Sequence, residues 1–246
     1  MSYDASSVDL GACPSPLASR YLPYGVVQIA GIIDQVEADM LVGAGVDMLG
    51  FPLRLPVNAV DLSEKVATVI ANTCAGKVPS CLITYLDQAS ALRDFVQEMN
   101  MPILQVHGRI TVNELARLRG MLPDLVIIKS LVVRDGNDDS LQQTLRKATP
   151  YVDAFITDTF DPTTGASGAT GKCHDWQISA RLVQLSERPV ILAGGLHPDN
   201  VADAIQMVRP WGVDTHTGVE SPDGRKDLTK VAEFVKRAKL ALRTTN

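Results

Sequence analysis

Short runs of β-branched and other apolar residues recur about every thirty residues along this chain, and an amphipathic stretch follows each run. The runs span residues 26–30, 48–52, 80–85, 103–107, 125–130, 154–158, 190–193 and 212–215. They are apolar almost throughout, as strands are when both faces of a sheet are covered. Spacing of this length predicts parallel strands joined by crossover helices.

Eight such units fit the chain length of 246 residues, which is the usual size of one (β/α)8 barrel. Residues 111–114 form a capping box, and Pro198 fits the first turn of a helix, so both predict helix starts between strands. Eight evenly spaced units favour a closed barrel over an open doubly wound sheet. We predict an α/β fold: a single TIM barrel over residues 26–246, with an irregular N-terminal extension over residues 1–25.

Composition and charge exclude several classes of partner. The net charge is −5 and no basic cluster is present, which argues against nucleic acid and anionic membranes. No apolar run approaches the ~18 residues that cross a bilayer, and the start of the chain lacks the pattern of a signal peptide. The four cysteines show no metal-type spacing. We expect a cytoplasmic protein without metal or cofactor, either a monomer or a homodimer.

Glycine-rich turns follow the last two predicted strands. Gly194 and Gly195 come directly after the seventh, and Thr217 and Gly218 come shortly after the eighth. Glycine lets backbone N–H groups approach a ligand closely, and helix N-termini favour anions. In a (β/α)8 barrel the turns after strands seven and eight often bind phosphate, so these four residues are predicted to cradle a phosphate group.

Three polar residues stand where strands are predicted to end, at the mouth of the barrel. Asp158 ends the sixth strand, where apolar walls could raise its pKa to that of a general acid; it could instead cap a loop. His107 ends the fourth strand and could bind substrate or simply pack against backbone. His216, in the last turn, could contact a ligand or lie on the surface.

Two lysines allow other chemistry. Lys129, near the end of the fifth strand, could form a Schiff base with a carbonyl substrate or pair with a carboxylate, and we favour the pairing. Lys172 ends a glycine-rich segment that lacks the full P-loop spacing, so nucleotide binding is not expected. The surrounding stretch, residues 159–173, is predicted to be an active-site loop.

Several segments of the second half match motifs of one enzyme family. The matching residues are Leu104-Gln105-Val106-His107-Gly108, Thr157-Asp158-Thr159, Gly168-Ala169-Thr170-Gly171-Lys172 with Asp175-Trp176, Leu192-Ala193-Gly194-Gly195-Leu196 and Gly218-Val219-Glu220. On these motifs the chain resembles the phosphoribosylanthranilate isomerases, the (β/α)8 barrels of tryptophan biosynthesis. The resemblance extends over about residues 26–242.

The resemblance implies an Amadori rearrangement of a phosphorylated sugar, with Asp158 as the general acid. In the family, a cysteine at the end of the first strand removes the proton from the sugar C2. Here that position is Ala30, and Gln28 stands in place of a family lysine. A methyl group cannot accept a proton, so we predict a relocated base: His216 first, with Asp34 or a held water as alternatives.

The substrate side also departs from the family. The arginine that contacts the anthranilate carboxylate in the family corresponds to Ala59, and Arg54 could reach the site only from a shifted loop. His107, Arg54 and Lys129 are therefore our predicted substrate-binding residues. The sequence favours an isomerase of a small phosphorylated sugar. It leaves two alternatives open: an epimerase or a Lys129-dependent aldolase, and a sugar-phosphate binder without catalysis.

Overall fold

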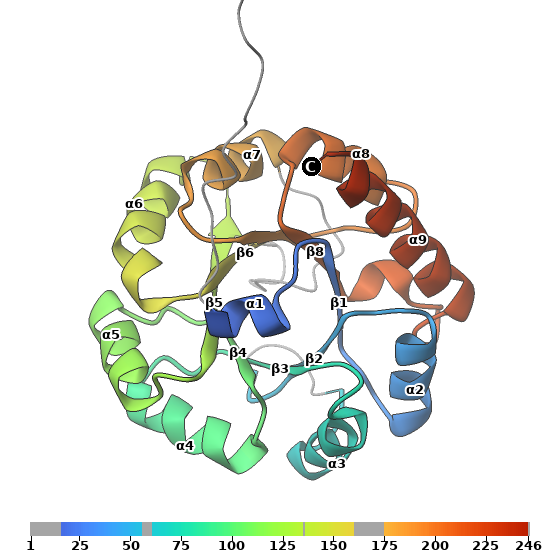
Figure 1. Ribbon diagram of the computed structural model, residues 1–246, viewed down its shortest axis with the longest axis horizontal. Helices are drawn as coiled ribbons and strands as arrows, with labels where there is room; N and C mark the ends of the chain where they lie inside the picture. Colours follow the sequence, from blue (N-terminus) through green and yellow to red (C-terminus); the bar gives the residue numbers. More distant parts are fainter. Residues whose placement is uncertain (1–15, 56–60, 135, 160–174, 246) are drawn as a thin grey trace, which may run out of the picture.

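Eight parallel strands close into a barrel in chain order, from β1 round to β8 (Figure 1). The computed structural model describes residues 16–55, 61–134, 136–159 and 175–245. The strands are β1 (Val26–Ala30), β2 (Met48–Pro52), β3 (Ser80–Thr84), β4 (Ile103–Val106), β5 (Val126–Val133), β6 (Ala154–Thr159), β7 (Val190–Leu192) and β8 (Gly212–Thr215). The closed order confirms the predicted (β/α)8 barrel and excludes the open sheet.

A ring of helices surrounds the strands (Figure 1). Its members are α2 (Gln35–Gly43), α3 (Glu64–Cys74), α4 (Ala89–Met99), α5 (Val112–Met121), α6 (Asp138–Ala148), α7 (Trp176–Leu185), α8 (Val201–Val208) and α9 (Leu228–Thr244). The described part of the chain also has two 3-10 turns, η1 (Thr149–Tyr151) and η2 (Thr217–Val219).

Of the two predicted helix starts, the structure confirms the one at Thr111 and not the one at Pro198. The Thr111 hydroxyl accepts the N–H of Glu114 at 3.2 Å, as a capping box requires. The Glu114 carboxylate, however, accepts the N–H of Ala89 at the start of α4, at 2.7 Å, and so caps the neighbouring helix. The prediction for Pro198 was wrong: α8 begins at Val201, and Pro198 lies in the turn before it.

A short helix, α1 (Pro16–Tyr21), lies inside the stretch that was predicted to be irregular. Figure 1 shows it across the centre of the barrel. Ala18 and Leu22 are fully buried among residues from the amino-terminal ends of the strands, such as Ile103 and Val126. The indole N–H of Trp211 donates to the Leu22 carbonyl oxygen at 3.0 Å. This helix therefore closes the amino-terminal end of the barrel.

Side chains alternate between two cores along each strand. On β1, Val27 and Ile29 pack outward against the helices, whereas Val26 and Ala30 belong to the core inside the barrel. Gln28 also points inward, because its side-chain amide donates to Gln105 of β4 at 3.3 Å, and β1 and β4 are not neighbouring strands. The barrel interior is thus apolar near α1 and becomes polar toward the carboxyl ends of the strands.

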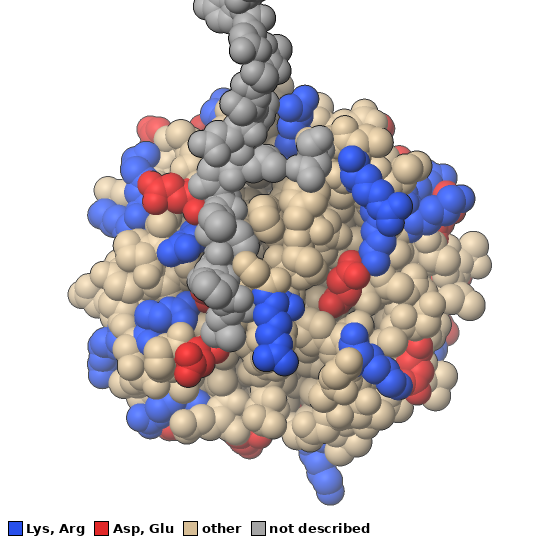
Figure 2. Space-filling model, viewed as in Figure 1, with Lys and Arg blue, Asp and Glu red and all other residues tan. Residues whose placement is uncertain are grey.

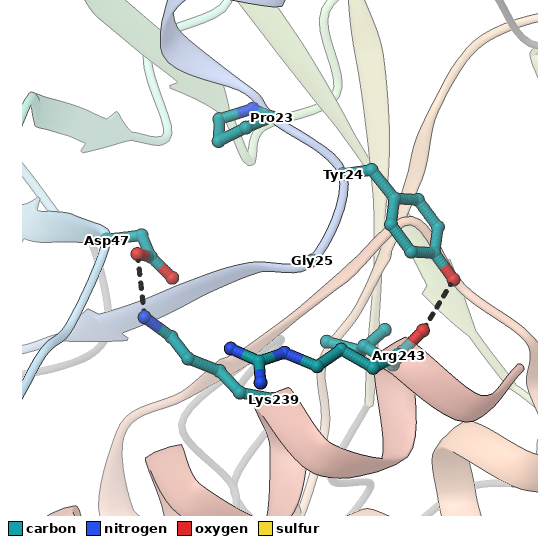
Figure 3. A pocket seen from close by; sticks show the side chains of 7 residues that line it. Pro23, Tyr24, Gly25, Asp47, Lys239 and Arg243 are labelled. Carbon is teal, nitrogen blue, oxygen red and sulfur yellow. Dashed lines mark hydrogen bonds and ion pairs between the residues drawn. The ribbon is translucent and has the colours of Figure 1, made fainter. Parts of the chain in front are cut away.

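A small hollow lies at the amino-terminal end of β1, away from the strand ends that carry the polar residues (Figure 3). Across it, the Lys239 ammonium group lies 2.9 Å from the Asp47 carboxylate, and the Tyr24 hydroxyl donates to the Leu242 carbonyl oxygen at 3.1 Å. These contacts tie α9 to the starts of β1 and β2.

The described residues include no helix that is both long and apolar enough to span a bilayer. On the face seen in Figure 2, Lys and Arg side chains are interspersed with Asp and Glu side chains.

Candidate active site

Asp158 and His107 lie together at the carboxyl end of the barrel. Asp158 Oδ2 is 3.4 Å from His107 Nε2, and His107 Nδ1 shares a hydrogen bond of 2.8 Å with the Ser130 hydroxyl. The Tyr85 ring packs against the imidazole with 4.8 Å between ring centroids. Ser130 of β5 and Tyr85, which follows β3, therefore hold the imidazole, and the imidazole contacts the Asp158 carboxyl of β6.

Burial sets the protonation of Asp158. Its residue exposure is 8%, and removal of the carboxyl from water raises its pKa to about 7, although the backbone N–H of Thr159, which donates at 2.7 Å, opposes this shift. A carboxyl with such a pKa retains a proton near neutral pH and can donate it. This is the environment that a general acid needs.

His216 lies beside the end of β1. Its ring occupies the space that a Cβ at Gly31 would need, and Gly31 has a φ of +79°. Nε2 of His216 lies 3.4 Å from the Glu220 carboxylate. Burial, and then the positive charge of Lys226, lower the pKa of His216 to about 3. A group with so little affinity for protons does not suit the role of base that the sequence predicted.

A buried lysine connects the loops that follow β8 and β1. The Lys226 ammonium group lies 2.6 Å from Glu220 Oε1 and donates to the His216 carbonyl oxygen at 3.1 Å. The backbone N–H of Lys226 donates to Glu37, whose carboxylate also accepts the N–H of Ile33. Sequence reasoning missed this network, because Glu37 and Lys226 are 189 residues apart in the chain.

Asp214 is a second acidic residue of the barrel interior, and sequence reasoning missed it as well. It lies opposite Gln28 in the β1–β8 register. Burial raises the pKa of its carboxyl to about 8, the negative charge of Asp158 adds to the rise, and Lys226 and a hydrogen bond from Gln28 oppose it. The sequence did offer one signal for this site, an acidic residue inside an apolar strand. The register adds that Asp214 lies on the same inward face as Gln28.

The two glycine-rich turns meet. Gly194 and Gly195 have φ values of +100° and +67°, which only glycine adopts readily. A Cβ at Gly218 would overlap the carbonyl oxygen of Leu196, so the turns after β7 and β8 are in direct contact. The Thr215 hydroxyl donates to that same oxygen at 2.7 Å. Thr217 begins η2 beside this contact, so all four predicted cradle residues lie in one place.

Arg54 and Lys129 are held elsewhere. The guanidinium of Arg54 lies 2.8 Å from Glu64 and 2.9 Å from Glu98, over the ring of Phe95, so it is bound to α3 and α4. Lys129 occupies an outward position of β5, where its ammonium group donates to the carbonyl oxygens of Gly108 and Ser130. Burial lowers the pKa of Lys129 to about 8. The structure brings neither residue to Asp158.

Some predicted features fall outside the described residues. These are Ala59, Lys172 and all of the predicted loop over residues 159–173 except Thr159. Within the described ranges, no group of three or more His, Cys, Asp or Glu side chains is arranged to hold a metal ion. Cys74 and Cys81 are buried free thiols, and burial raises the pKa of both.

Comparison with known proteins points to one family. The family model described as N-(5'phosphoribosyl)anthranilate (PRA) isomerase matches residues 56–237. N-(5'-phosphoribosyl)anthranilate isomerase 2 of Methanosarcina mazei is 37% identical, over 87% of this chain and 93% of that protein. The isomerase of Methanothrix thermoacetophila is 33% identical, over 87% and 97%.

Solved structures agree with the sequence comparisons. The phosphoribosyl anthranilate isomerase of Thermotoga maritima superimposes with a TM-score of 0.73 at 27% identity, covering 87% of this chain and 98% of that one. The isomerase of Pyrococcus furiosus gives 0.71 at 25% identity, covering 88% and 99%. The chain therefore belongs to the N-(5'-phosphoribosyl)anthranilate isomerase family.

Proposed function

We propose that this chain isomerises N-(5'-phosphoribosyl)anthranilate to the carboxyphenylamino-deoxyribulose phosphate in tryptophan biosynthesis. The observation that carries the proposal is Asp158, a buried carboxyl that keeps its proton near neutral pH at the carboxyl end of the barrel. The names of the relatives support the same reaction. A phosphoribosyl anthranilate isomerase structure that holds reduced 1-(o-carboxyphenylamino)-1-deoxyribulose 5-phosphate supports the same class of ligand.

Asp158 acts as the general acid. It donates its proton to the ring oxygen of the ribose while the C1–O bond breaks, and the nitrogen lone pair forms a protonated imine at C1. His107, 3.4 Å from the carboxyl, orients Asp158 and contacts the sugar. Loss of the C2 proton then gives an enolamine, which becomes the ketone product.

The glycine turns hold the phosphate group of the substrate. The backbone N–H groups of Gly194, Gly195, Thr217 and Gly218 supply the donors, and the positive φ values of the first two expose the backbone. All these residues come from one chain, so a monomer and a homodimer would serve equally. The partner is a small phosphorylated sugar derivative, and the enzyme works in the cytoplasm without a cofactor.

One observation favours a second function. Ala30 removes the family's base, which would leave a protein that binds a sugar phosphate without turning it over. The aldolase alternative loses support, because the Lys129 ammonium group is engaged by two backbone carbonyl oxygens.

The test is to assay the purified chain for conversion of phosphoribosylanthranilate. We expect saturable turnover. Binding of the reduced product without any turnover of substrate would establish the binder and refute the isomerase.

A further inference from the structure

The isomerisation proposed above leaves one proton without an acceptor, and the inference that follows rests on that proposed function. The base must reach the sugar C2 near Ala30, which has no proton acceptor. His216 has too low a proton affinity. Asp34 is engaged at both oxygens: Oδ2 lies 2.6 Å from Arg225, and Oδ1 accepts the N–H of Glu37 at 2.9 Å.

Asp214 lies one strand away from the vacant position. It is opposite Gln28 in the parallel β1–β8 register, and Ala30 follows Gln28 on the same inward face of β1. The Gln28 amide crosses the barrel to Gln105, so this row of side chains points into the interior. Taken over all its atoms, Asp214 is partly exposed. Because α1 closes the other end of the barrel, that exposure is toward the mouth.

One oxygen of Asp214 has an unused capacity to accept. Oδ1 is buried and has no hydrogen-bond partner among the described residues. A buried acceptor without a donor costs free energy, so a carboxyl oxygen left in this state is a candidate for a functional role. The Gln28 side chain donates to the same carboxyl, and the charge of Lys226 favours its ionised form. The carboxyl is thus oriented on one side and keeps an unpartnered acceptor oxygen on the other.

Asp158 and Asp214 act on each other electrostatically. Two carboxyls that share a buried interior do not readily ionise together, so near neutral pH they hold one proton between them. Gln28 and Lys226 favour the negative charge on Asp214, but its pKa of about 8 stays above the pKa of about 7 of Asp158, so the form with Asp214 ionised and the proton on Asp158 is the less populated of the two singly protonated forms. That form is the one that reacts, because Asp158 must donate a proton and Asp214 must accept one.

We infer that Asp214 is the general base that replaces the family's cysteine and removes the C2 proton of the substrate. The proton moves from C2 to Oδ1 of Asp214. The C2–H electron pair forms the C1–C2 double bond, and the π pair of the protonated imine moves to nitrogen. The product of this step is the neutral enolamine, and no oxidant or reductant takes part.

The experiment compares the wild-type chain with Asp214→Asn, which keeps the size of the side chain and removes its basicity. We expect kcat to fall about 10²–10⁴-fold while KM changes little. Asp203→Asn, on the exposed side of α8, is the matched control and keeps wild-type kcat. Substrate with deuterium at C2 should react more slowly than unlabelled substrate in Asp214→Asn, because proton removal has become rate-limiting.

Rescue separates a base from a structural residue. Two rescues should each raise kcat roughly tenfold or more above that of the unrescued variant, because each restores a proton acceptor. One is formate added to Asp214→Ala, and the other is Ala30→Cys combined with Asp214→Asn. Asp214→Asn with kcat within about threefold of wild type would overturn the inference. So would a loss of kcat that neither rescue relieves and that shows no isotope effect. A wild-type chain without turnover would instead refute the proposed function, and this inference with it.

A second variant keeps the inference testable if Asp214→Asn does not fold. Gln28→Met removes the amide that donates to Asp214, and this hydrogen bond lowers the pKa of the carboxyl. Since the base must be ionised, the acidic limb of the kcat profile should move to higher pH. An unchanged pH profile in a folded Gln28→Met variant would contradict the assignment.

Discussion

At the scale of single residues, Asp158 links stability to chemistry. Its pKa is raised from 3.8 to about 7 in the folded chain, so ionisation of this carboxyl favours unfolding. Its contribution to stability is present below pH 3.8 and is lost as the pH rises to about 7. We expect Asp158→Asn to raise the melting temperature at pH 8 and to change it little at pH 4. An equal effect at both pH values would contradict the burial of a protonated carboxyl.

The same residue predicts an activity profile. Asp158 must carry a proton to donate it and Asp214 must be ionised to accept one, so kcat should peak between the two pKa values of the pair, about 7 and about 8, and fall at higher pH. Asp158→Asn should lower kcat about 10²–10⁴-fold at pH 6, measured by conversion of phosphoribosylanthranilate. The exposed Asp203→Asn is the control. Retention of wild-type kcat by Asp158→Asn would remove it from the chemistry.

Functional residues at strand ends could be predicted from the sequence, because a polar residue that follows an apolar run is easy to recognise. Asp158 and His107 are such residues. Asp214 was not predicted, since a single acidic residue inside a strand gains meaning only when the register places it on the inward face. The environment of His216 could not be predicted from the sequence either, because the fold brings Lys226 and Glu220 close to its ring.

At the scale of elements, periodicity located all eight strands, and their predicted ends differ from the observed ones by a few residues at most. β5 extends furthest beyond its prediction, because it continues to pair with β6 as far as Val133 and Thr159. The short helix α1 was missed, because its 6 residues are too few to show a helical periodicity of apolar residues. Its position is decided by burial of Ala18 and Leu22 against the barrel interior.

That burial gives a prediction for stability. Leu22→Ala should lower the free energy of unfolding by about 2–5 kcal/mol, because Leu22 is fully buried. Leu240→Ala, at a site 63% exposed, should change it by less than about 0.5 kcal/mol. Denaturant titration measures both. The kcat of Leu22→Ala should stay unchanged, since α1 lies at the opposite end from Asp158. A Leu22→Ala variant as stable as Leu240→Ala would show that α1 is not packed on the barrel.

At the scale of the whole molecule, closure of the barrel assembles a site that no single unit contains. It places the turns after β7 and β8 against each other and sets Asp214 beside β1. Gly218→Ala should force these turns apart, because the added Cβ would overlap the Leu196 carbonyl oxygen. We expect KM to rise about tenfold or more as phosphate contacts are lost. Gly120→Ala is the control, since nothing lies within 4 Å of a Cβ there. Equal KM values for the two variants would place the phosphate elsewhere.

The most direct measurement is a crystal structure of this chain with reduced 1-(o-carboxyphenylamino)-1-deoxyribulose 5-phosphate bound. We expect the phosphate group within hydrogen-bonding distance of the backbone N–H groups of Gly195 and Gly218. We expect the Asp158 carboxyl to face the former ring oxygen of the sugar, and Asp214 to face C2. A ligand whose phosphate group lies away from both glycine turns, or a sugar beyond the reach of Asp158, would contradict the proposed site.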